Sequence, residues 1–129
     1  MLTLAMIIGL WSTSCIQTQI SQVNRGYMIE SYEFKSNGDF DHTREWFNDP
    51  GCKDKIQVEE RNGTLEIGHK LKVFAIGVNA FAADYNTSNG TDLGAIAKKD
   101  ENSLLISRGI PNSYMRNTML SLFPFYKIR

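Results

Sequence analysis

The amino-acid sequence predicts an all-β fold, an antiparallel up-and-down β-barrel of about eight strands with at most one short helix. Runs rich in aromatic and β-branched residues follow one another at short intervals. Turn residues separate these runs, and Asn37-Gly38 is the clearest hairpin signal. Apolar and polar residues alternate over 65–73, the period of a strand with one buried face. Because closure removes the exposed edges of such a meander, we expect a barrel.

The length and composition bound the domain organisation and exclude one class of partner. A chain of 129 residues suffices for one core and is too short for two ordinary domains, so we predict one β-barrel domain over residues 1–129. Hydrophobic residues make up 42% and charged residues 22%, which argues against wholesale disorder. Lysine plus arginine and aspartate plus glutamate number 14 each, so the basic excess of a nucleic-acid-binding protein is missing.

The first segment, 2–11, is almost wholly apolar. It is shorter than the roughly 20 residues that a membrane-spanning helix needs, so we expect no transmembrane span. It is similar to the core of a signal peptide but lacks the basic residues that precede such a core. We interpret it as a long, buried first strand. Such a strand can begin just after a removed signal, and a lipoprotein-type cleavage before Cys15 is the alternative.

Cys15 and Cys52 are the only cysteines in the chain. An even pair in a small chain rich in Thr, Asn and Ser predicts one disulfide and an oxidising compartment. We therefore expect a secreted or periplasmic protein of the cell envelope. The alternative is two buried cysteines that remain unpaired.

The other strands follow from runs of strand-forming residues and the turns between them. After the first strand we predict strands over 27–34, 40–47, 56–58, 65–73, 74–85, 103–108 and 120–128. Asn48-Asp49-Pro50-Gly51 and a second Asn-Gly pair, Asn62-Gly63, are predicted turns, and 86–94 is a predicted loop. Residues 77–79 favour a strand over a helix in the run that contains them, and any helix falls near 112–122.

Two motifs in the first half of the chain carry a family resemblance. Gly9-Leu10-Trp11 opens the first strand, and Cys15 follows Trp11 by four residues. The pattern continues through Ser31, Tyr32, Phe34, Asn37, Phe40 and Cys52. It resembles the opening of lipocalin-like (calycin) barrels, including the barrel domain of the adenomatosis-polyposis-coli down-regulated Wnt antagonists and small bacterial secreted lipocalin-like proteins.

The resemblance, which covers residues 9–68, implies a lipocalin-like barrel with an apolar interior and a Cys15–Cys52 bridge. It also implies that Trp11 plugs one barrel end and packs against an arginine from late in the chain. Arg116 is the first candidate for that arginine, and Arg129 and Arg108 are the others.

The leading functional hypothesis is non-enzymatic binding of a small hydrophobic ligand inside the barrel. A pocket of this kind is mostly apolar and carries a few placed polar groups. The predicted ligand-binding residues are Tyr32, Phe34, Phe40, Trp46, Phe74, His69 and Arg44, and Glu30 is a further polar candidate. The alternative is a secreted or envelope protein-binding module, an inhibitor or accessory factor, whose barrel is filled by side chains.

Metal binding and catalysis have weaker support. Asp39, Asp41, His42 and Glu45 lie close together, but Asp41 and His42 are neighbours on a strand and should point to opposite faces. The chain contains neither Gly-x-Ser-x-Gly nor His-Glu-x-x-His. We therefore predict no catalytic residues, no metal and no cofactor.

Overall fold

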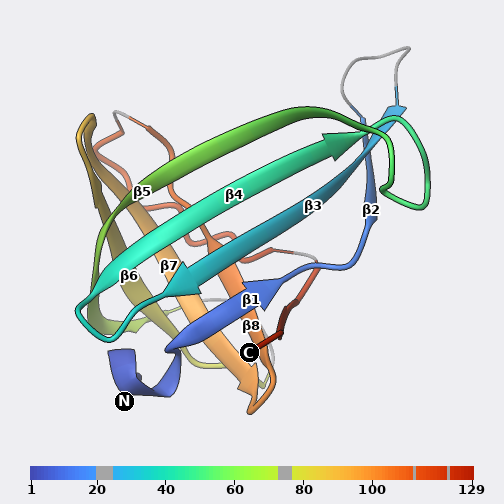
Figure 1. Cartoon of the computed structure of the whole chain (residues 1–129). Helices are drawn as coiled ribbons and strands as arrows, with labels where there is room; N and C mark the ends of the chain where they lie inside the picture. The colour runs from blue at the N-terminus through green and yellow to red at the C-terminus, as the bar shows by residue number, and fades with distance from the viewer. Residues whose placement is uncertain (20–24, 73–76, 112, 122) are drawn as a thin grey trace.

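The computed structural model describes residues 1–19, 25–72, 77–111, 113–121 and 123–129 (Figure 1). A short 3-10 turn, η1, spans Leu4–Met6. The strands are β1 (Gly9–Ser12), β2 (Ile16–Gln19), β3 (Arg25–Phe34), β4 (Asp39–Phe47), β5 (Lys55–Leu71), β6 (Ala80–Thr87), β7 (Gly90–Asp100), β8 (Ser103–Ser107) and β9 (Phe125–Lys127).

The strands form a closed antiparallel barrel, as the sequence predicts. Each strand from β3 to β8 pairs with the next, and β9 pairs with β8. β1 closes the barrel because it pairs with β9 on one side and with β3 on the other. β2 also pairs with β3, so β1 and β2 occupy one position and the barrel has eight positions. The backbone bonds Leu10 N–H to Arg129 O and Ile128 N–H to Leu10 O extend the closing seam.

Aromatic side chains fill the core. The largest fully buried residues are Trp11, Tyr32, Tyr85, Phe34, Phe40, Phe125, Ile7, Ile96 and Leu104. The rings of Tyr32 and Phe125 meet edge to face with centroids 5.4 Å apart, and so do those of Phe40 and Tyr85. Such pairs stabilise a core beyond their buried area.

The predicted hairpin at Asn37-Gly38 is confirmed. β3 and β4 pair from Tyr27 opposite Phe47 to Phe34 opposite Phe40. Gly38 has a φ of +94°, which glycine adopts without steric cost. The side chain of Asn37 accepts a hydrogen bond from the backbone N–H of Asp39, which fixes the turn.

The second Asn-Gly pair is not a turn, so that prediction is wrong. β5 runs without interruption through Asn62 and Gly63 and joins the two strands predicted at 56–58 and 65–73. A Cβ atom at Gly63 would clash with the carbonyl oxygen of Asn86 on the neighbouring strand. Glycine is present here because two backbones approach closely.

The loop predicted over 86–94 is a tight turn. β6 and β7 pair as far as Thr87 opposite Gly90. The Thr87 hydroxyl accepts a hydrogen bond from the N–H of Asn89 and donates one to the carbonyl of Gly90. Gly90 has a φ of +121°. The chain therefore gains a long strand, β7, that the sequence patterns did not predict.

The predicted terminal strands are shorter in the structure. The first begins at Gly9 rather than at Leu2, because η1 turns the chain and places Leu2 and Ile7 against the core. The last strand is confined to β9. Pro124, directly before it, has no N–H to donate to a ladder. The described residues 113–121 contain no helix.

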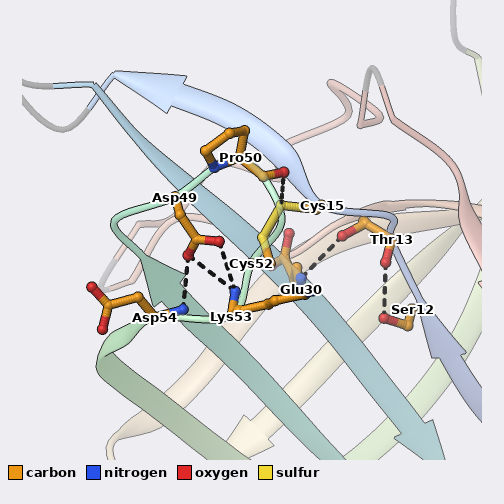
Figure 2. The surroundings of a disulfide bond; sticks show 9 residues. All are labelled: Ser12, Thr13, Cys15, Glu30, Asp49, Pro50, Cys52, Lys53 and Asp54. Atoms are coloured by element: carbon orange, nitrogen blue, oxygen red, sulfur yellow. Dashed lines mark hydrogen bonds between the residues drawn. A yellow bond between two sulfur atoms is a disulfide. The ribbon is translucent and has the colours of Figure 1, made fainter.

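The Cys15–Cys52 disulfide is present, with the two Cα atoms 5.9 Å apart (Figure 2). Cys15 lies between β1 and β2, and Cys52 lies in the turn between β4 and β5. The bridge therefore links segments on either side of β3. Asp49 shapes the turn, because its carboxylate accepts the backbone N–H groups of Lys53 and Asp54 (Figure 2).

A last feature concerns membranes. Among the described residues, we find no helix whose length and apolar character would let it cross a bilayer.

Candidate functional site

Ionisable side chains occupy one end of the barrel interior. On β3, Glu30, Tyr32 and Phe34 alternate with outward residues and share the inner face. Their cross-strand partners on β4 are Arg44, His42 and Phe40. The inner face of this hairpin thus changes from aromatic at Phe34 to charged at Glu30.

Glu30 is the centre of the buried polar cluster. Its carboxylate accepts a hydrogen bond from Nε2 of His42 and another, 2.9 Å long, from Nε of Arg44. Burial alone would raise the pKa of Glu30, but the bond from His42 and the charge of Arg44 outweigh burial and lower it. Glu30 is therefore a carboxylate at neutral pH.

His42 is held neutral beside this carboxylate. Burial lowers its pKa, and the opposing influence of Glu30 does not restore the usual value. Its ring stacks on Tyr32 with centroids 4.1 Å apart and planes 12° apart. Burial, followed by the charge of Glu30, raises the pKa of Tyr32, so its hydroxyl stays protonated.

Arg61 on β5 separates the aromatic core from the polar end. Its guanidinium carbon lies 5.5 Å from the ring centroid of Phe40 and 5.1 Å from that of Tyr85. Nη1 forms an ion pair with the buried carboxylate of Asp92, and Nη2 lies 3.4 Å from the Tyr32 hydroxyl. These contacts fix the guanidinium in one position.

A space of about 230 Å³ opens above this cluster. We call it the barrel mouth; its lining residues are His42, Arg44, Glu59, Glu60, Arg61, Asn89 and Arg108. Arg108 is half-buried, and within the described residues its guanidinium has no ion pair or hydrogen bond. Burial, and then the charges of Arg44 and Arg61, lower its pKa. The mouth therefore holds a guanidinium whose donors are free.

The predicted ligand-binding residues do not gather around this space. Arg44 lines the mouth, whereas the side chains of Tyr32, Phe34 and Phe40 belong to the filled core and Trp46 is partly exposed on β4. His69 is exposed, because a bulge between Ile67 and Lys70 shifts the alternation of β5. Phe74 lies outside the described residues.

Arg61, Asp92 and Arg108 were missed as site residues. Arg61 has the same parity as Leu65 and Ile67, which signals an inward side chain on a continuous strand. The turn predicted at Asn62-Gly63 concealed that signal. Asp92 belongs to a segment predicted as loop, and Arg108 follows β8 directly.

Trp11 is fully buried, and the cation above its ring is Lys127 rather than an arginine, with Nζ 5.7 Å from the ring centroid. The reason is register, because Trp11 pairs directly with Lys127 between β1 and β9. Arg116 has another structural role. It donates to the carbonyls of Ala83 and Gly94 and forms an ion pair with Asp84, which ties the C-terminal segment to β6 and β7.

Asp41 and His42 point to opposite faces, as the alternation of a strand predicts. Asp41 pairs with Lys35 on the outside of the hairpin, while His42 faces Glu30 inside. In the part of the chain that the structure describes, no three or more histidine, cysteine or acidic residues form a group suited to a metal ion.

Comparisons with protein-family models, with curated proteins and with solved structures found no match to this chain.

The buried pair of His42 and Glu30 predicts that the protein loses stability in mild acid. The unfolded state protonates histidine near pH 6.5, whereas the folded state protonates His42 only at lower pH. Glu30 acts in the same direction below the ordinary pKa of 4.5, because its folded-state pKa is also lowered. The free energy of unfolding should therefore fall from pH 7.5 to pH 5.5 and fall further by pH 4, as measured by urea unfolding.

Glu30→Gln should reduce the loss between pH 5.5 and pH 4, because the carboxylate of Glu30 is no longer there to be protonated. Asp41→Asn makes the same chemical change on the outside of β4 and should leave the pH dependence close to that of the unmodified protein. Equal stability of the unmodified protein at pH 7.5 and pH 5.5 would contradict a buried neutral His42.

Proposed function

We propose that this chain is a non-enzymatic binding protein that holds a small ligand in the barrel mouth. The single observation that carries the proposal is the space of about 230 Å³ lined by Arg44, Arg61 and Arg108, among others. The lining is polar throughout, unlike the mostly apolar pockets that are usual for small molecules, so its convergent polar groups suit a polar ligand. The contacts of Glu30 and Arg61 hold these groups in place before a ligand arrives.

The hydrophobic ligand predicted from the sequence stays a prediction. Tyr32, Phe34 and Phe40, which were expected to line its pocket, are each about 1% exposed and pack against one another or against neighbouring rings. A large hydrophobic ligand would have to displace these rings. The mouth suits a smaller ligand with a polar group, and this is the ligand we propose.

We also propose that the barrel is lipocalin-like. The resemblance is supported by the position of Trp11, which follows Gly9 at the start of β1 and is fully buried under a cation from late in the chain. The disulfide supports an oxidising compartment, and thus a secreted or periplasmic location, because such bonds persist there.

A second candidate function is the protein-binding module. One observation favours it: large apolar side chains are exposed along the C-terminal segment, namely Ile110, Tyr114, Met115, Met119, Phe123, Tyr126 and Ile128. Exposed apolar surface marks many interaction sites. We prefer the small-ligand function because the mouth is concave and the contacts of Glu30 and Arg61 hold part of its lining in place, whereas these side chains are spread along the chain from Ile110 to Ile128.

Titration of ¹⁵N-labelled protein with neutral, anionic and cationic small molecules tests the proposal. At least one class should shift the amide resonances of His42, Arg44 and Arg108 in a saturable manner. If no compound of any charge shifts these resonances at millimolar concentration, the mouth is not a ligand site. A fluorescent fatty acid in the same series tests the larger hydrophobic ligand, which saturable binding reversed by an unlabelled fatty acid would support.

A further inference from the structure

The polar groups of the mouth differ in how far the protein already satisfies them. Arg61 uses Nη1 and Nη2 for Asp92, Tyr32 and the carbonyl of Arg108, and its buried Nε has no partner within the described residues. Arg44 uses Nε for Glu30, and its two terminal nitrogens have no partner within the described residues. Arg108 has no side-chain partner there at all. Two guanidinium forks on the lining of one space are therefore free to donate.

The charges inside the mouth do not balance. Three guanidinium groups face two buried carboxylates, those of Glu30 and Asp92. His42 is neutral and adds no charge. Among these groups one positive charge remains, and the exposed Glu59 and Glu60, which also line the space, form no ion pair with it within the described residues. A ligand with one negative charge would compensate it.

The rim of the mouth limits how negative the ligand can be. Glu59 lies opposite Arg44 in the β4–β5 register, and Glu60 is its neighbour; both line the space and are exposed. In the described part of the chain, neither forms an ion pair within 4.0 Å of an arginine. Their charges repel a dianion more strongly than a monoanion.

The geometry of the donors indicates the charged group of the ligand, and the size of the space limits the rest of the molecule. Guanidinium forks match a planar carboxylate through paired N–H···O bonds. A volume of about 230 Å³ equals roughly seven or eight water molecules at about 30 Å³ each. A carboxylate alone fills a small part of that space, which leaves room for a body of the size of one ring.

We propose that the barrel mouth binds an organic monocarboxylate, with its carboxylate between the guanidinium groups of Arg44 and Arg108. This inference rests on the proposed function and adds the chemical class of the ligand. Arg61, paired with Asp92, lies behind the site, and Asn89, in the β6–β7 turn, offers an amide at the rim.

Benzoate and benzamide are the probes, because they share a ring and differ in the charged group. In a low-chloride buffer at pH 7.5, the dissociation constant for benzoate should be at least tenfold lower than that for benzamide. Both are measured from the shifts of the amide resonances of the mouth. Inorganic phosphate should bind more weakly than benzoate. Arg108→Gln should weaken benzoate binding at least tenfold, whereas Arg129→Gln, which removes an exposed guanidinium outside the mouth, should leave it unchanged.

Glu59→Gln provides a second test that does not depend on loss of function, because removing a negative charge from the rim should tighten benzoate binding. Equal affinity for benzamide and benzoate would contradict the proposal that the ligand is a carboxylate, but it would leave the proposed function intact. Tighter binding of phosphate than of benzoate would indicate that the ligand is an inorganic anion and not a carboxylate. If neither ring compound nor any other small molecule reaches the mouth, the proposed function itself fails.

Discussion

Replacing both Cys15 and Cys52 by serine is expected to lower the free energy of unfolding by about 4 kcal/mol. The bridge joins residues 37 positions apart, and on the chain-entropy estimate closing a loop of that length stabilises the folded state by about 4 kcal/mol. A loss of that size removes a large part of the roughly 5–15 kcal/mol that stabilises a typical domain.

The structure predicts where the loss acts. Among the described strands, β2 pairs only with β3, through four residues, and it lies just after Cys15. The turn that contains Cys52 is exposed and depends on hydrogen bonds to Asp49 (Figure 2). Without the bridge, the amides of β2 and of this turn should exchange with solvent hydrogen fastest.

Urea unfolding measures the loss as the difference between the double variant and the oxidised unmodified protein. Under reducing conditions, the unmodified protein should have the same free energy of unfolding as the double variant. Mass analysis without reductant should show the unmodified chain lighter than its reduced form by two hydrogen atoms. An unchanged mass, with both thiols alkylated in denaturant, would contradict the bridge. An unchanged unfolding midpoint in the double variant would contradict the contribution of the bridge to stability.

The two Asn-Gly pairs show how far local sequence predicts this fold. Asn37-Gly38 supplies a turn between two strands that pair with each other, and the prediction is confirmed. Asn62-Gly63 has the same chemistry but lies inside β5, where the backbone of Asn86 leaves no room for a side chain. That requirement comes from a strand distant in the sequence, so a local pattern could not reveal it.

Two errors in the strand assignment compensate each other. The predicted strands at 56–58 and 65–73 are one strand, β5, and the predicted loop at 86–94 conceals the start of β7. The number of barrel positions is therefore correct, although β5 was predicted as two strands and β7 was not predicted. Closure restricts the number of strands more strongly than it restricts their bounds.

The mouth was harder to predict than the barrel. Arg44 was among the expected site residues, but the ligand site that we propose also needs Arg108, which lies directly after β8. The two are 64 positions apart, and only the closed sheet brings them to one space. Sequence spacing carries no information on such convergence, whereas the charge imbalance becomes visible once the inward residues are known.

Trp11→Ala is the second substitution with a large expected effect, a loss of about 3–5 kcal/mol in the free energy of unfolding. The side chain is 0% exposed, and its indole N–H donates to the carbonyl of Ile7 over 2.8 Å. Removing it leaves a cavity under the N-terminal turn and removes the ring beneath Lys127.

The position of Trp11 in the barrel adds to this loss. β1 closes the barrel through two register pairs with β9, and one of them is Trp11 opposite Lys127. Trp11→Ala should therefore loosen the closing seam as well as the core. The amides of Leu10 and Ile128, which bond across the seam, should lose more hydrogen-exchange protection than those of the β3–β4 hairpin.

Trp46→Ala is the matched control, because Trp46 is only partly buried and its indole nitrogen has no partner among the described residues. It should cost clearly less than Trp11→Ala in the same denaturant titration. Trp11→Phe should fall between them, since the ring keeps most of the packing and loses a hydrogen bond worth about 1 kcal/mol. If Trp11→Ala costs no more than Trp46→Ala, Trp11 does not stabilise the closing seam between β1 and β9 as we expect.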